Sequence, residues 1–388
     1  MAHAQAPGTD SPLERTRADE LLEAPAGSAG LRVGGFELRA AAGMSFAYDS
    51  NVFAVDTPRT ESPLAVGEIL LRADNDALRR RLGVDAFVRT RRYDGHGELD
   101  ATEFGAASTF DWQPESRNSM RLDADAQRRV EPRVDIETPT DIPVSLYDDL
   151  SLQFAGEHAF NRLALRLELG TRRETYLEDS QAFRDLDQRD VQLRAAWQLR
   201  GDLAWTLTGY YDRDEFDEPS PLTESATTRG ALLGVDFVKP EILELQFAAG
   251  YFARHYEAGG QAADGLALRG SLAWYPTRLT SLRAELQRTD EPTQIPGAFS
   301  KVRTDLSVEL GHEYARDLGL FAGARVVVDE FESLSRTDRL YQAELGVSYA
   351  AGRHALLRAG WRYAARAEST PERDFVRHLF NVSFVGRL

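Results

Sequence analysis

The sequence contains no cysteine among its 388 residues, which excludes disulfide frameworks and cysteine-ligated zinc sites. Basic residues are also scarce, since 46 Lys and Arg stand against 62 Asp and Glu for a net charge of −16. A nucleic-acid binder needs a basic face to neutralise phosphates, so this balance argues against nucleic acid as a partner. No run approaches the roughly 18 apolar residues of a membrane-spanning helix. Barrel strands alternate apolar and polar residues, so a membrane barrel is still allowed.

Residues 1–35 lack the two-residue period of a strand and are rich in Ala, Gly, Pro and charge. We expect this segment to be a flexible N-terminal periplasmic tail. The AHAQA that follows Met1 is similar to the small-residue end of an export signal. The positively charged segment and the apolar segment that normally precede such an end are not found before it. One interpretation is therefore a signal-peptide remnant.

From Phe36 to the last residue the pattern is a period of two. In FELRAAAGMSFAY every second residue from Phe36 to Tyr48 is apolar, whereas Glu37, Arg39 and Ser45 lie on the other face. A helix would instead space its apolar residues three and four apart, so each such segment indicates a β-strand. Eighteen candidate strands follow: 36–49, 64–74, 81–93, 101–112, 118–132, 147–158, 162–176, 187–199, 202–216, 225–238, 242–256, 263–275, 279–289, 301–315, 318–331, 338–350, 354–366 and 374–388.

Most of these segments are about twice as long as globular strands and exceed the roughly 9 to 11 residues that cross a bilayer at a tilt. The connections alternate between tight links such as Gly201 and long polar excursions such as EPRVDIETPTDIP. Short periplasmic turns and long external loops are typical of outer-membrane barrels. We therefore predict an all-β fold in which residues 36–388 form a transmembrane antiparallel up-and-down barrel of about 18 strands, in the outer membrane of a Gram-negative bacterium.

The alternative is a soluble β-sandwich or solenoid whose apolar faces pack into a core. Eighteen strands of this length exceed the usual sheet sizes, and a sandwich has no reason to sort its loops by length. Aromatic residues near both strand ends also favour lipid, because amphipathic rings are stable at the headgroup level. The predicted membrane-interface residues are Tyr48, Trp112, Trp197, Trp205, Trp274 and Tyr363.

The polar faces of the strands would line a watery lumen, and they are densely charged. All basic residues except Lys239 and Lys301 are arginine, whose planar fork pairs bidentately with carboxylates on neighbouring strands. Such pairs either brace a wide barrel or form a charged conduit that guides polar solutes. The residues predicted to guide solutes are Arg39, Arg89, Arg91, Arg358, Arg362, Arg377, Asp85, Asp305 and Glu309.

Four of these arginines belong to strands that become neighbours when the barrel closes. Arg358 and Arg362 lie on the seventeenth predicted strand, Arg377 on the eighteenth and Arg39 on the first. We expect them to form a positive stripe that attracts an anionic solute or polymer. A lumen of eighteen strands is also wide enough for a channel unless the tail or a loop, such as residues 133–146, plugs it.

Catalytic signals are lacking. The seven histidines are scattered, and none belongs to a motif such as HExxH or GxSxG. Acid pairs such as Asp123 and Asp125 lie at strand spacing and suit a solvated wall better than a glycosidase dyad. The sequence therefore predicts a non-enzyme without cofactor or metal.

The first predicted strand ends in YDSNVF, from Tyr48 to Phe53. This element resembles the first hairpin of the putative beta-barrel porin 2 group of outer-membrane proteins. The resemblance implies a barrel of the kind encoded beside capsule and exopolysaccharide genes, some of which serve as the exit for a polymer. The first functional hypothesis is thus export of an extracellular or capsular polysaccharide through the charged lumen. The alternatives are a general diffusion porin for small polar solutes and a structural barrel that conducts nothing.

The expected surroundings follow from this location. We expect the barrel to contact outer-membrane lipid and lipopolysaccharide and to be inserted by the barrel-assembly machinery. Export of a polymer would add periplasmic polysaccharide-export components as partners. Nucleic acid is not among the expected partners.

Overall fold

The computed structural model describes residues 30–138, 144–217, 224–257, 262–293, 295, 297–298, 300–332, 334–368 and 374–387. Within these ranges the chain is almost entirely strand, with two short 3-10 helices, η1 (Gly97–Leu99) and η2 (Asp179–Arg184). No helix in the described part is long and apolar enough to cross a membrane. The predicted all-β class is therefore confirmed.

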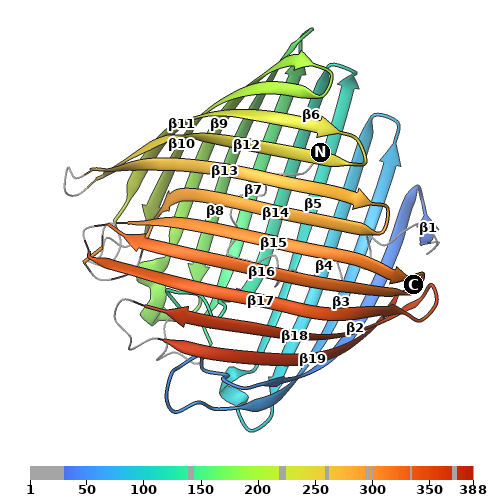
Figure 1. The fold of residues 1–388 in the computed structure, drawn as a ribbon, viewed down its shortest axis with the longest axis vertical. Coiled ribbons are helices and arrows are strands. Elements are labelled where there is room, and N and C mark those ends of the chain that lie inside the picture. Colours follow the sequence, from blue (N-terminus) through green and yellow to red (C-terminus); the bar gives the residue numbers. More distant parts are fainter. Residues whose placement is uncertain are drawn as a thin grey trace.

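Eighteen long strands form one closed antiparallel sheet. Each pairs with its neighbours in chain order, and β19 pairs with β2 to complete the ring, from Leu379 opposite Asp49 to Arg387 opposite Ala41. In Figure 1 the earlier strands lie behind and the later ones in front. The strands are β2 (Phe36–Asp49), β3 (Ser62–Ala77), β4 (Arg80–Tyr93), β5 (Ala101–Glu115), β6 (Asn118–Val130), β7 (Leu146–Ala159), β8 (Leu163–Tyr176), β9 (Leu186–Arg200), β10 (Leu203–Phe216), β11 (Ala226–Lys239), β12 (Leu243–Tyr256), β13 (Ala262–Thr277), β14 (Thr280–Glu291), β15 (Lys301–Ala315), β16 (Leu318–Phe331), β17 (Arg336–Ala350), β18 (Ala355–Ala367) and β19 (Phe375–Arg387).

A short extra strand precedes the barrel. β1 (Leu31–Val33) pairs with the start of β2, with Val33 opposite Phe36. Gly34 and Gly35 make the turn with φ of +57° and +91°, which glycine adopts without steric cost. Regular structure thus begins before Phe36, inside the segment predicted to be a tail. The expected export-signal remnant at residues 1–29 lies outside the described residues.

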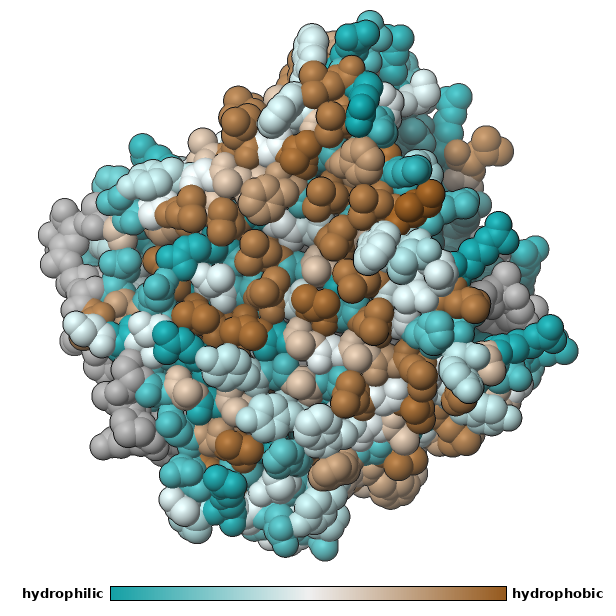
Figure 2. All heavy atoms as spheres, in the orientation of Figure 1, coloured by the Kyte–Doolittle hydropathy of each residue, from teal (hydrophilic) through white to brown (hydrophobic). Residues whose placement is uncertain are grey.

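The outward faces of the strands are apolar in their middle parts. Leu193 on β9, Leu207 on β10 and Leu233 on β11 keep 54%, 57% and 61% of their surface exposed. Figure 2 shows most of the hydrophobic side chains across the middle of the visible face, with hydrophilic ones towards its edges. Large exposed apolar surfaces are unusual in soluble proteins and suit contact with lipid.

A charge on this outward face is expected to destabilise the barrel strongly. Leu193 lies halfway along β9, so Leu193→Arg places a guanidinium near the middle of the bilayer and lowers the free energy of unfolding by about 2–4 kcal/mol. Urea unfolding in lipid vesicles measures this change. Gln192→Arg, one position away on the lumen face, is the matched control. Equal losses for both variants would contradict the assignment of the two faces.

Candidate functional site: the charged lumen

The lumen wall is built from alternate residues of all eighteen strands. Arginines there pair with carboxylates on the same or adjacent strands, as the sequence suggested. Arg172 on β8 contacts both oxygens of Asp149 at 2.9 and 3.0 Å, and Arg303 on β15 contacts both oxygens of Asp329 at 2.8 Å. These bidentate pairs fix the rotamers of long side chains across neighbouring strands.

One group of the predicted lumen residues lies on β4 and its neighbours. The Nε of Arg89 lies 3.2 Å from Glu68 Oε2 on β3, and Arg91 Nη2 lies 2.6 Å from Glu103 Oε2 on β5. Asp85 accepts a hydrogen bond of 2.5 Å from Arg72. Arg89 and Arg91 therefore belong to one ion-pair network across β3, β4 and β5, and Asp85 belongs to an ion pair between β3 and β4.

Two further predicted residues lie on β15. Asp305 Oδ1 accepts a hydrogen bond of 2.9 Å from Arg325 Nε on β16. Glu309 stands opposite Arg283 on β14 and opposite Gly323 on β16. Asp305 thus forms an ion pair across two strands, and Glu309 has an arginine at the directly opposed position.

The four arginines of the predicted stripe lie on neighbouring strands, but they do not gather. Arg39, near the start of β2, contacts Glu37 at 3.0 Å and Asp74 at 3.4 Å. Arg377 lies near the start of β19, at the other end of the pairing between β19 and β2. Its Nε contacts both oxygens of Asp49 at 3.0 Å. The pairing of Arg39 and of Arg377 with carboxylates interrupts the expected stripe of positive charge.

Arg358 and Arg362 remain together on β18. Arg362 Nε lies 3.5 Å from Glu344 Oε1 on β17, and the guanidinium of Arg358 lies 4.7 Å from the centre of the Phe321 ring on β16. Phe321 lies flat along the wall because Gly346 has no side chain; a Cβ there would come within 2.2 Å of the ring. This cation–π contact holds Arg358 against the wall.

The opposite part of the wall carries carboxylates without such partners. Asp190 on β9 and Asp212 on β10 face each other directly across the two strands. Neither has an ion pair or hydrogen bond with any residue that the structure describes. The charge that acts on both carboxyl groups is that of Arg269 on β13, and the pair is a local concentration of acidic groups on the lumen wall.

A buried ion cluster joins the long-loop ends of β10, β12 and β14, which are separated in the sheet by β11 and β13. The side chain of Arg254 on β12 is 1% exposed, with Nη1 2.8 Å from Asp214 Oδ2 and Nε 3.1 Å from Asp290 Oδ2. The residue of β13 directly opposite Arg254 is the small Ala263. The sequence analysis did not distinguish Arg254 from the other arginines of the polar faces.

The segment Pro132–Thr138, which follows β6, crosses the lumen. It contacts β15 and β18, which lie on the far side of the ring from β6 and β7. Asp135 Oδ1 lies 3.3 Å from Arg303 Nη2, and the Asp135 carbonyl accepts a hydrogen bond of 2.9 Å from Arg366 Nη1. Glu137 accepts hydrogen bonds from Lys301 and Thr293.

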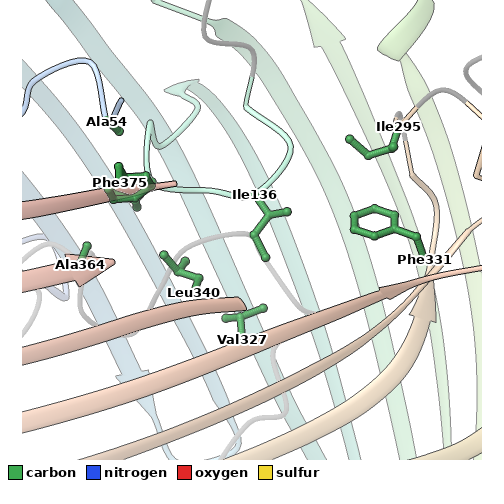
Figure 3. Packing of buried hydrophobic residues seen from close by; sticks show 9 residues of the cluster. Ala54, Ile136, Ile295, Val327, Phe331, Leu340, Ala364 and Phe375 are labelled. Atoms are coloured by element: carbon green, nitrogen blue, oxygen red, sulfur yellow. The ribbon is translucent and has the colours of Figure 1, made fainter. Parts of the chain in front are cut away.

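Apolar packing supports the same crossing. Ile136 is fully buried in a cluster with Val134, Val327, Leu340 and Phe375, and Figure 3 shows Ile136 directed towards Leu340 and Val327 of the far wall. Burial alone would raise the pKa of Asp135, but the charges of Arg303, Lys301 and Arg325 hold that pKa at about 2. Asp135 is therefore ionised at neutral pH. Of the loop named as a plug, residues 139–143 lie outside the described part.

The predicted interface aromatics lie on the outward face. Trp112, Trp197, Trp205 and Trp274 stand near the short turns with 36%, 51%, 50% and 41% of their surface exposed, and Trp197 is opposite Trp205. Tyr48 lies at the long-loop end of β2 and is 40% exposed. At that same end, Tyr363 contacts Trp361 and His378, a cluster that the sequence analysis did not identify.

Comparisons with known proteins agree with this architecture. Among solved structures, the chain is similar to the outer membrane protein opdK of Pseudomonas aeruginosa, with 11% identity, a TM-score of 0.50, and coverage of 91% of this chain and 99% of that one. It is also similar to a BenF-like porin from Pseudomonas fluorescens Pf-5, with 10% identity, a TM-score of 0.51, and coverage of 92% and 100%. At these identities the likeness shows the fold alone. No curated protein matches the chain.

The family comparison is more specific, because the sequence profile described as "Putative beta-barrel porin 2" matches residues 24–388. Such porins are barrels of the Gram-negative outer membrane, in agreement with the predicted location. The chain therefore belongs to the Putative beta-barrel porin 2 family.

Proposed function

We propose that this barrel is a passive conduit for small polar solutes across the outer membrane, with a preference for cations. The observation that carries the proposal is the pair of acidic residues Asp190 and Asp212, which face each other on the lumen wall without an ion pair or hydrogen bond in the described part of the chain. A charged wall raises the local concentration of oppositely charged solutes. Transport of this kind needs no chemistry.

The segment Pro132–Thr138 favours small solutes over a polymer. It crosses the lumen and is held at its far side by Arg303, Lys301 and Arg366. A polymer chain would have to pass beside this segment. Export of a polysaccharide, the first hypothesis from the sequence, has no support in the comparisons, and the BenF-like porin of the same fold is a porin by name.

The cation preference is tested by planar-bilayer recording in a salt gradient. The double variant Asp190→Asn/Asp212→Asn removes the two carboxylates, so we expect the cation-to-anion permeability ratio to fall towards one. Asp148→Asn is the matched control, because Asp148 pairs with Arg128 on the outward face. An unchanged permeability ratio in the double variant would refute the role of Asp190 and Asp212, the acidic wall, in selecting cations.

The same recordings separate the alternatives. In the expectation first drawn from the sequence, Arg358 and Arg362 guide anions, and Arg358→Gln/Arg362→Gln would then abolish a preference for anions. In the present proposal that variant increases the preference for cations. Absence of conductance steps from the purified barrel would instead favour a structural barrel.

A further inference from the structure

Basic side chains gather on the outward face at the long-loop ends of β10, β11 and β12. Arg213, Arg229 and His255 alternate with the neighbouring small residues Thr227 and Ala253, which stand opposite them across the strands. Neighbours on one face of a sheet lie about 5 Å apart, and diagonal ones about 7–8 Å apart. Arg229 is the diagonal neighbour of both Arg213 and His255, so an anionic group bound at Arg229 is within reach of either side chain.

Arg229 is the member of this patch that has no carboxylate. Within the described ranges it forms no ion pair, and its guanidinium lies 5.7 Å from the centre of the Tyr211 ring, directly opposite on β10. Arg213 is shared between Glu215, at 2.5 Å, and Glu257, at 3.2 Å. The exposed Arg229 thus supplies the uncompensated positive charge.

The depth of the patch follows from the strand itself. Arg229 and Lys239 lie on the same outward face of β11, ten residues apart, with Ala231, Leu233 and Val235 among the residues between them. Ten residues span about 33 Å along a strand. At a tilt of about 40° this becomes about 25 Å across the membrane, which equals the usual height of the apolar band of such barrels. Lys239 lies at the short-turn end, so Arg229 lies at the outer boundary.

The geometry points to a binding site for the phosphate of an outer-leaflet glycolipid, formed by Arg229 and Arg213 with His255 beside them. Arginine is suited to phosphate because its planar fork donates two parallel hydrogen bonds. Tyr211 and Tyr251, the latter 56% exposed, border the site on the membrane side, where aromatic rings contact both acyl chains and headgroups. This site is separate from the lumen and independent of the proposed transport function.

The test measures binding of bis-phosphorylated lipid A to the detergent-solubilised full-length barrel by native mass spectrometry. We expect Arg213→Gln/Arg229→Gln to weaken binding by about tenfold or more, because two charge-assisted contacts are lost. Arg339→Gln, an exposed outward arginine at the same end of β17, is the matched control and should leave binding unchanged. Unchanged single-channel conductance of the double variant shows that the barrel is folded.

Three results would overturn the proposal. Equal binding of lipid A after removal of its phosphates would show that the acyl chains alone are recognised. Competition by inorganic phosphate at the concentration of the lipid would show a simple anion site. A change in oligomeric state of the double variant would assign the patch to contact between two copies of the chain.

Discussion

Replacing Arg254 by methionine is expected to lower the free energy of unfolding of the barrel by about 3–5 kcal/mol. The change removes the charge that Asp214 and Asp290 share, at 2.8 and 3.1 Å, and leaves two buried carboxylates without their counter-ion. Thr228, whose hydroxyl lies 3.2 Å from Arg254 Nη1, cannot replace a positive charge. Urea-induced unfolding in lipid vesicles, followed by tryptophan fluorescence, measures the loss.

A matched variant separates burial from charge. Arg194→Met breaks the pair with Asp236, but the side chains of this pair keep 26% and 21% of their surface exposed, so we expect a loss of about 1 kcal/mol or less. Adding Asp214→Asn and Asp290→Asn to Arg254→Met should restore much of the stability. Equal losses for Arg254→Met and Arg194→Met would refute the view that the Arg254 cluster is a buried ion site.

Releasing the segment that crosses the lumen is expected to increase single-channel conductance severalfold. Asp135→Asn/Glu137→Gln removes the charges that attract Arg303 and Lys301, and leaves the hydrogen bond from Arg366 to the backbone and the packing of Ile136 as the remaining contacts with the far wall. Movement of the segment towards β6 and β7 would widen the path for ions. Recordings in a planar bilayer at fixed salt concentration measure the conductance of each open channel.

The control for this experiment is Asp187→Asn, whose carboxylate lies 3.7 Å from Arg173 on the outward face. It removes an acidic residue without touching the lumen and should leave conductance unchanged. A double variant whose conductance equals that of the unmodified barrel would mean that the segment does not limit the path. The acidic-wall prediction would be unaffected, because Asp190 and Asp212 lie on other strands.

The strands could be predicted from the sequence because one physical constraint acts on every one of them. A side chain that contacts lipid must be apolar, and alternate residues face the lumen, so the period of two persists from β2 to β19. The fourteen residues from Phe36 to Asp49 form β2, as the pattern predicted. β1 was missed because three residues, Leu31–Val33, are too few to establish a period.

The lumen was less predictable because its contacts join distant parts of the chain. Asp135 and Arg303 are separated by 168 positions, and nothing near either residue indicates the other. The separation of Arg39 from Arg377 has a different cause. Each lies near the start of its strand, and the starts of two antiparallel strands lie at opposite ends of their pairing, so these two arginines of the predicted stripe are far apart.

Closure of the ring by β19 and β2 constrains how the molecule is made. Until the final strand is synthesised, any partial sheet presents two edges of unpaired backbone groups, which are costly in hydrocarbon and invite aggregation in water. The first barrel strand, β2, therefore gains its second partner only after β19, the last strand, has been synthesised. A chain that ended before Phe375 would lack β19 and could not close the sheet. This requirement favours delivery of the chain to the membrane in an unfolded state, followed by closure of the barrel there in one step.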